Sequence, residues 1–137
     1  AKQHDVVAAI VAMVTNAMPD AQVSRGGSKP ERAHPGGNVI IREGKPEETD
    51  VDLSPLTYHY SHPVPIEIFA PNRDTVVALL IGLGAAIEAD RTLGGQVEFL
   101  EPETPDDNDV EALGVPDGRD VEVRVIATYS VVGSALR

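Results

Sequence analysis

The sequence predicts an α+β fold in which two main helices pack on a mostly antiparallel sheet. Two stretches repeat apolar residues at helical spacing, and several shorter stretches alternate apolar and polar residues. The strands follow one another through short polar connections, which is not the strand–helix alternation of a doubly wound parallel sheet. At 137 residues the chain is about one domain long, so we expect a single core spanning residues 1–137.

The first helix is predicted directly after Asp5. Apolar residues recur at helical spacing from Val7 to Met18, and Pro19 ends the pattern because it has no backbone N–H to donate. Methionine fills irregular gaps in cores, so Met13 and Met18 are interpreted as packing residues.

Residues 24–38 (SRGGSKPERAHPGGN) predict a long loop or a hairpin tip. The segment has four glycines and two prolines and almost no apolar residue to bury. Loops of this length inside a domain are uncommon and are often functional or disordered. This loop therefore either stays solvated or becomes ordered against an acidic partner.

The middle of the chain predicts strands. Residues 38–42 and 51–53 are short β-branched or apolar stretches joined by a charged turn. Residues 56–68 then alternate, with the apolar side chains at even positions. Pro63 and Pro65 remove two N–H donors from the same lateral side. Either the strand lies at an edge there, or two strands meet in a bend at 62–65.

The second helix begins after Asn72, whose side chain can cap it, with Asp74 in the first turn where an anion is favoured. One stripe of apolar residues is predicted to face the sheet: Val76, Leu80, Leu83 and Ile87. Three more apolar residues widen this stripe: Val77, Leu79 and Ile81. A helix this apolar should be covered on more than one side, and a neighbouring subunit is one candidate for the second cover.

Small residues interrupt the middle of this helix at 82–86 (GLGAA). The spacing imitates a dinucleotide-binding fingerprint, but it lies inside a helix rather than after a strand. We interpret these residues as allowing close helix packing.

The helix ends at residues 90–92 and a tight reversal follows. Thr92, Leu93, Gly94 and Gly95 are predicted to form a structural turn, because glycine accepts positive φ without a Cβ penalty. A strand is expected at 96–99. Residues 101–118 carry seven acids and no base, which predicts a solvated acidic loop, and residues 121–132 show the clearest strand alternation in the chain.

Composition limits the function classes. A net charge of −11 repels nucleic acid phosphates unless a basic patch overrides it. The absence of cysteine excludes a disulfide framework and thiolate metal sites, and it fits a reducing cytoplasm. Since the chain has no long apolar run and no secretory leader pattern, we expect a soluble protein that does not bind membranes.

No metal or cofactor site is predicted. His59 and His62 lie three residues apart on a strand, so they should point to opposite faces. The acidic run at 107–118 starts like a calcium loop but has Ala112 and Gly118 where that loop needs glycine and glutamate. A small enzyme using Asp90, Arg91, His59 or His62 in a cleft remains an alternative, as does a regulatory or ligand-binding module.

Residues 87–99 (IEADRTLGGQVEF) end a helix, and the strand-like VEVRVIATYSVV at 121–132 follows after an acidic segment. This combination resembles the small tail terminator, or tail-completion, proteins of long-tailed bacteriophages and related prophages. The resemblance covers mainly residues 72–132, and the N-terminal half adds a compatible order of elements.

The resemblance implies a structural virion protein rather than an enzyme, with no catalytic residues and no cofactor. Such proteins have an α+β fold and form a hexameric ring that caps the tail tube, stops its polymerisation and offers a joining face to the head connector. The implied partners are further copies of the chain, the major tail tube protein and a head-completion or connector protein, with DNA only passing through the channel. The implied location is the neck end of the virion tail, after assembly in the bacterial host cytoplasm. Another head–tail junction or minor tail component is the nearest alternative.

In such a ring, oppositely charged segments of neighbouring copies can meet. The candidate interface residues are Arg25, Lys29 and Arg32 in the basic loop, and Asp106, Asp107, Asp109 and Glu111 in the acidic one. A second possibility is that the basic loop faces the ring's channel.

Overall fold

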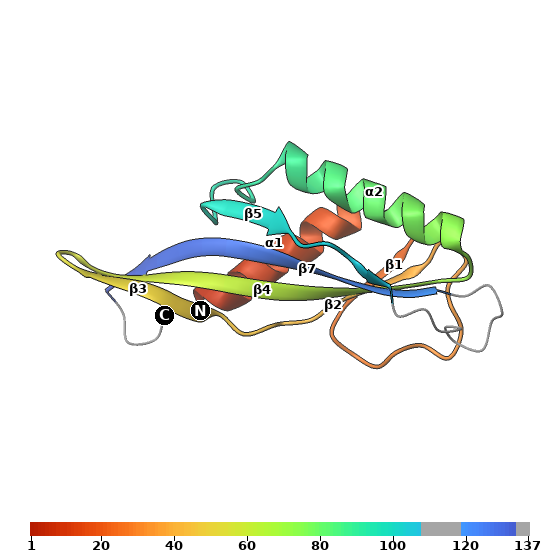
Figure 1. Cartoon of the computed structure of the whole chain (residues 1–137), viewed down its shortest axis with the longest axis horizontal. Coiled ribbons are helices and arrows are strands. Elements are labelled where there is room, and N and C mark those ends of the chain that lie inside the picture. Colours follow the sequence, from red (N-terminus) through yellow and green to blue (C-terminus); the bar gives the residue numbers. More distant parts are fainter. Residues whose placement is uncertain (108–118, 134–137) are drawn as a thin grey trace.

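The computed structural model describes residues 1–107 and 119–133, and in these ranges two helices lie on one face of a single sheet (Figure 1). The predicted α+β fold is confirmed. The elements, in chain order, are α1 (Lys2–Ala17), β1 (Gln22–Arg25), β2 (Asn38–Ile41), β3 (Glu47–Leu53), β4 (Leu56–Ala70), α2 (Arg73–Ala89), β5 (Phe99–Pro102), β6 (Asp106–Asp107) and β7 (Arg119–Val132).

The sheet is built around two long antiparallel strands, β4 and β7, which pair from Thr57↔Val132 to Ala70↔Arg119. On the outer side of β4, β2 and β3 follow one another along the same strand. On the outer side of β7, β5 and β6 do the same. β1 continues the sheet beyond β2 and is parallel to it, so the sheet is mixed but mostly antiparallel.

The two prolines of β4 face the gap between β2 and β3. β2 leaves β4 at Ile41↔Ile66, and β3 joins it at Glu47↔Ser61. The carbonyl of Pro65 still accepts from the Arg42 amide at 2.9 Å. Because a residue's N–H and C=O point to the same side of a strand, the missing N–H groups of Pro63 and Pro65 point to this gap. The edge interpretation is therefore correct, and β4 continues through both prolines as one strand.

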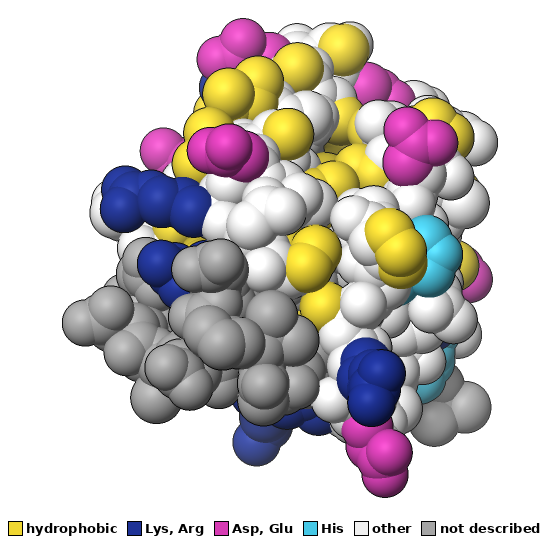
Figure 2. All heavy atoms as spheres, turned by 90° about the vertical axis from the view of Figure 1, so that its right-hand side faces the viewer, with side chains coloured by type: hydrophobic (Ala, Val, Ile, Leu, Met, Phe, Trp, Pro, Cys, Tyr) yellow, Lys and Arg dark blue, Asp and Glu magenta, His cyan; other side chains and the backbone are white. Residues whose placement is uncertain are grey.

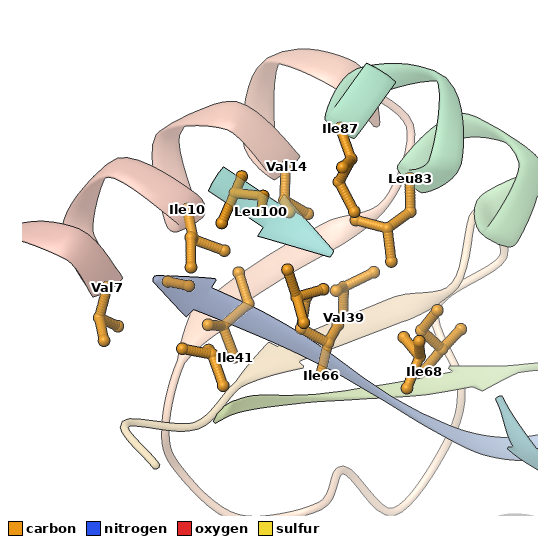
Figure 3. Packing of buried hydrophobic residues seen from close by; sticks show 14 of the residues in the cluster. Val7, Ile10, Val14, Val39, Ile41, Ile66, Ile68, Leu83, Ile87 and Leu100 are labelled. Carbon is orange, nitrogen blue, oxygen red and sulfur yellow. The ribbon is translucent and has the colours of Figure 1, made fainter. Parts of the chain in front are cut away.

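The core lies between the helices and the helix-facing side of the sheet (Figure 3). Val7, Ile10 and Val14 come from α1, and Leu83 and Ile87 from α2. They pack against inward side chains of four strands, including Val39, Ile41, Ile66, Ile68, Leu100 and Val125. The even positions of β4 are buried from His62 to Ile68, as the alternation predicts.

The stripe of α2 differs from the prediction at one position. Its buried residues are Val76, Leu79, Leu83 and Ile87, whereas Leu80 is only half-buried. Leu79 and Leu80 both continue a three-or-four spacing from Val76, and only the angle at which the helix meets the sheet decides between them. Asn72 caps the helix as predicted, because its Oδ1 accepts from the Thr75 amide at 2.8 Å.

The two glycines of α2 are open within this chain. A Cβ built on Gly82 or Gly84 would meet nothing within 4 Å apart from the helix itself. Within this chain, no other element uses the space beside Gly82 and Gly84, and close packing against another molecule stays a prediction.

Several boundaries also shift. α1 begins at Lys2 rather than after Asp5, and β3 begins at Glu47, inside the predicted charged turn. The strand expected at 96–99 begins at Phe99, because the preceding residues still belong to the turn. The acidic segment is not only a loop, since its described part contains the end of β5 and all of β6.

Neither helix in the described ranges is long and apolar enough to cross a membrane.

Candidate functional site

The basic loop joins two parallel strands, so it is not a hairpin tip. β1 ends at Arg25 and β2 begins at Asn38, and most of the loop between them lies on the side of the sheet away from the helices (Figure 1). The Arg42 guanidinium donates to the Gly27 carbonyl and also binds Glu67 of β4, at 2.8 Å from Nε to Oε2. This contact fixes the start of the loop against the second face of the sheet.

Arg25 forms an ion pair within its own chain. Its Nε and Nη2 donate to the two carboxylate oxygens of Glu43, at 2.7 and 2.6 Å, which is a bidentate pair. The hydrogen bond from Arg25 lowers the pKa of Glu43 below its ordinary value. Both side chains are partly exposed, so the pair orients the loop more than it stabilises the fold.

Lys29 also forms an ion pair within its own chain. Its Nζ donates to Asp120 Oδ2 at 2.6 Å and lies 4.6 Å from the centre of the Phe69 ring. Phe69 points to the second face of the sheet and is buried. The loop thus covers an aromatic side chain that the predicted polar face of β4 would have left in water.

Arg32 is the third base of this loop, and it forms no ion pair with the described residues. In the acidic segment, Asp106 and Asp107 form β6 and pair with Glu122 and Val121. Asp109 and Glu111 lie outside the described residues.

The basic loop binds the start of β7, close to the strand β6 that contains Asp106 and Asp107. Lys29 binds Asp120, the residue next to the β7 partner of Asp107. Lys29 is therefore neutralised within the chain by an acid that lies outside the predicted acidic segment. One acid of the segment has a counter-charge from elsewhere in the chain, since Arg124 of β7 binds Glu103 at 2.8 Å.

The Asp90–Gly95 turn is held by its own side chains. Asp90 Oδ1 accepts from the Gly94 amide at 3.0 Å, and Thr92 Oγ1 accepts from the Gly95 amide at 3.2 Å. Gly94 and Gly95 have φ values of +67° and +95°, and Leu93 at +50° turns its side chain into the core. The phrase DRTLGG therefore encodes a defined turn with an apolar anchor.

Arg91 fastens this turn to β5. Its Nη1 donates to the Leu100 carbonyl at 2.9 Å, and its guanidinium carbon lies 5.1 Å from the centre of the Phe99 ring. With Asp90 holding Gly94 and Arg91 holding β5, both side chains proposed for an enzyme mechanism have structural partners.

The two histidines lie on opposite faces of β4, as predicted. His62 is buried: its Nε2 donates to the Glu43 carbonyl at 2.7 Å, and its Nδ1 accepts from the Tyr129 hydroxyl at 3.0 Å. Burial lowers the pKa of His62 and raises that of Tyr129 to about 12. His59 faces outwards with Nε2 2.8 Å from Asp52, and this hydrogen bond raises its pKa. No group of three or more metal-ligating side chains occurs among the described residues.

A groove of about 550 Å³ runs between α1 and α2. Five alanines, three from α1 and two from α2, line it together with Met13, Leu93 and several polar residues. Asp90 also lines it, but its carboxylate already binds the Gly94 amide. His62 borders a different cavity of about 60 Å³, so Asp90 and His62 do not share one cleft.

Among the described residues, two surfaces expose large apolar side chains close together. The first, which we call the arm, consists of β3, residues 56–61 of β4 and residues 128–132 of β7, and it projects beyond the helices (Figure 1). Leu53 at its tip is 83% exposed and Leu56 is 39% exposed. The second, which we call the α2 strip, is formed by Val77, Leu80, Ile81 and Gly84. Its Ile81 is 68% exposed and its Val77 is 44% exposed.

Comparison with solved structures finds the same fold in a virus-like particle. A chain from the virion of a native gene transfer agent particle superposes with a TM-score of 0.56, at 17% sequence identity. The match covers 93% of this chain and 95% of that one, so the likeness extends over the whole fold. No protein-family model and no curated protein matches this sequence.

The sequence pointed to charged loops and did not identify the arm as a surface. Residues 56–60 alternate like the rest of β4, so the pattern alone predicts a covered face. One available clue was the composition of 47–53, since a strand with four acids in seven residues is typical of an exposed edge.

Proposed function

We propose that this chain is a structural component of a phage-like virion and, within it, the tail terminator. It would form a ring that caps the tail tube, stops its polymerisation and offers the joining face to the head connector. The observation that carries this proposal is the likeness in fold to a gene transfer agent virion chain over nearly the full length of both chains.

A role in assembly also fits the surface of the molecule. Subunits of a closed ring meet through two different surfaces, each complementary to the other. The arm and the α2 strip are candidates for these surfaces, because both expose apolar side chains and they are located on different parts of the fold. A protein that acts through these contacts needs no catalytic side chain, and we propose that it is not an enzyme.

The proposed partners are further copies of this chain, the major tail tube protein and the head-completion or connector protein. DNA would pass through the ring without being bound, since the chain carries a net charge of −11. The proposed location is the neck end of the tail, reached after assembly in the bacterial cytoplasm.

Contact between the basic and acidic loops of neighbouring copies stays a prediction, and it rests mainly on Arg32. Replacing Arg25 or Lys29 would break ion pairs inside the chain as well, whereas Arg32 has no ion pair with the residues that the structure describes. If Arg32 contacts the next copy, R32E should slow ring formation in a salt-dependent way. If it faces the channel, R32E rings should form normally but join tails poorly.

The test of the proposed function is the mass of the purified protein by light scattering, with negative-stain images of the same sample. Rings of uniform size are expected, and a monomer at all concentrations would contradict the proposal. Deletion of the gene in the particle-producing strain should then give tails of uncontrolled length. Tails of normal length without attached heads would instead indicate another component of the head–tail junction.

A further inference from the structure

We propose that the α2 strip of one copy packs against the α2 strip of a second copy, with the two helices antiparallel and related by a two-fold axis. A two-fold contact closes after two copies, so the pair does not itself grow into a ring. The inference rests on the proposed function in one respect: the pair is the form in which free copies keep the strip covered before they enter a ring.

The strip continues to a charged residue at each end of α2. Residues three or four apart lie on one side of a helix, and this side of α2 carries Arg73, Val77, Leu80, Ile81, Gly84 and Glu88. None of them lines the groove between α1 and α2, so the strip lies on a side of α2 that α1 does not cover. Figure 2 looks at the end of the molecule where α2 begins and shows hydrophobic side chains exposed over this helix.

The order of residues along the strip is self-complementary in an antiparallel pair. Leu80 and Ile81 of one copy meet the same residues of the partner at the centre of the contact. Positions 77 and 84 lie equally far from this centre, so Val77 lies opposite the partner's Gly84. Positions 73 and 88 are also equally far from it, so Arg73 lies opposite the partner's Glu88. The two-fold axis makes each of these contacts twice.

Val77 and Gly84 have complementary sizes. Val77 is 44% exposed, and a Cβ built on Gly84 would meet nothing within 4 Å. Glycine is a poor helix former, and packing within the described part of the chain does not require it at position 84. The partner's Val77 can fill this space, and the missing Cβ lets the two helix backbones approach closely.

The charges identify a second copy as the partner. Arg73 and Glu88 are both exposed, and neither forms an ion pair with the described residues. An antiparallel pair places each beside the opposite charge of the partner, whereas a parallel pair would place like charges together. The remaining charged residue of α2, Asp74, lies about 100° round the helix from Arg73, at the outer rim of this side, where it is exposed.

Charge exchange tests the contact, with sedimentation velocity on dilute protein as the measurement. Arg73→Glu and Glu88→Arg each turn both attractions of the pair into repulsions, so each should weaken dimerisation about tenfold. Both changes suit the helix dipole, so neither should unfold the monomer, and thermal melts will check this. The double variant Arg73→Glu, Glu88→Arg restores both attractions and should dimerise like the wild type.

An equimolar mixture of the two single variants should form mixed dimers, because an arginine then meets a glutamate at both ends of the contact. Equal dimerisation of the wild type and all variants would overturn the inference. A double variant or a mixture that associates no better than the single variants would overturn it as well, since a contact between other surfaces gives no such rescue.

The two open glycines of α2 provide a matched pair of variants. Gly82→Leu and Gly84→Leu both replace a helical glycine that has open space beside it, so both should raise helix propensity. Gly82 is two residues from Gly84 and therefore lies on a different side of the helix. Only Gly84→Leu should prevent dimerisation, and equal behaviour of the two variants would contradict the close approach of two α2 helices.

The failure of the inference and the failure of the proposed function give different results. Rings that assemble from monomers, with no dimer at any concentration, would contradict the pairing and leave the proposed function intact. Dimers that follow the charge pattern but never give rings at higher concentration would contradict the proposed function and leave the pairing intact.

Discussion

The two halves of β4 carry the same alternation and have different surroundings. Residues 62–70 are covered by both helices on one face, and the basic loop buries Phe69 on the other. Residues 56–61 pair with β3 and β7 just as regularly, yet they remain exposed or half-buried. Regular pairing and regular alternation therefore do not reveal whether a face is covered.

The same contrast occurs on α2, where the buried stripe and the exposed strip are both apolar. A monomer gains nothing from exposed valine and isoleucine at 77 and 81, while a packed neighbour would bury them. We infer that uncovered apolar surface on this chain marks where other molecules bind, and the following predictions test the boundary between covered and uncovered residues.

The largest effect should come from the buried half of β4. Ile66→Ala should lower the free energy of unfolding by about 2–5 kcal/mol, because the side chain is fully buried and leaves a cavity. Leu56→Ala in the arm should cost about 1 kcal/mol or less, since much of its surface is already in water. Urea unfolding at low protein concentration measures both, and equal losses would mean that the arm is covered in the monomer.

Truncation of a side chain in the buried stripe of α2 should destabilise the fold more than truncation in the α2 strip. Leu83→Ala should cost about 2–5 kcal/mol, and Leu80→Ala clearly less, because Leu80 is only half-buried. Thermal melts of the two variants beside the wild type are sufficient. A larger loss for Leu80 would restore the stripe expected from spacing alone and contradict the observed helix rotation.

Substitution of glycine should destabilise the fold where φ is positive and should not where the glycine is helical and open. Gly94→Val or Gly95→Val should lose about 1–3 kcal/mol, since both residues have positive φ and a β-branched side chain is strained there. Gly84→Ala should instead stabilise the monomer by up to about 1 kcal/mol. Normal yield and stability for both valine variants would show that the turn is a flexible spacer.

The smallest effect concerns the two histidines and pH. The folded pKa of His62 is lowered by burial, so the unfolded chain takes up the proton first and stability falls as pH drops below about 6.5. The folded pKa of His59 is raised by Asp52, so its contribution is present at low pH and is lost as pH rises through the folded pKa.

Melting temperatures between pH 5 and pH 8 separate the contributions of His62 and His59 to stability. His62→Gln should be less stable at pH 8 but should lose less on acidification than the wild type does. His59→Gln should lose slightly more than the wild type, because it removes the group that opposes the acid loss. Identical pH profiles for the wild type and His62→Gln would show that His62 titrates normally.

Much of the fold could be predicted from the sequence because it depends on local chemistry. The Asn72 cap, the positive φ of Gly94 and Gly95, and the alternation of β7 each follow from residues close together in the chain. The loss of regular pairing at Pro63 and Pro65 was predictable for the same reason, since a missing N–H cannot be supplied by any tertiary arrangement, but the choice between an edge and a bend was not.

Only the tertiary structure decided which apolar residues are covered. In the folded chain Leu79 is buried rather than Leu80, and Gly84 and Ile81 have no neighbour packed on them. Arg25 and Lys29 form ion pairs within the chain. Burial depends on elements far apart in sequence: α1 and α2 cover residues 62–68 of β4 on the core side but leave its first half uncovered. The pattern of apolar residues determines which surfaces must be buried, and the reach of the chain's own helices determines which of them are left for a partner.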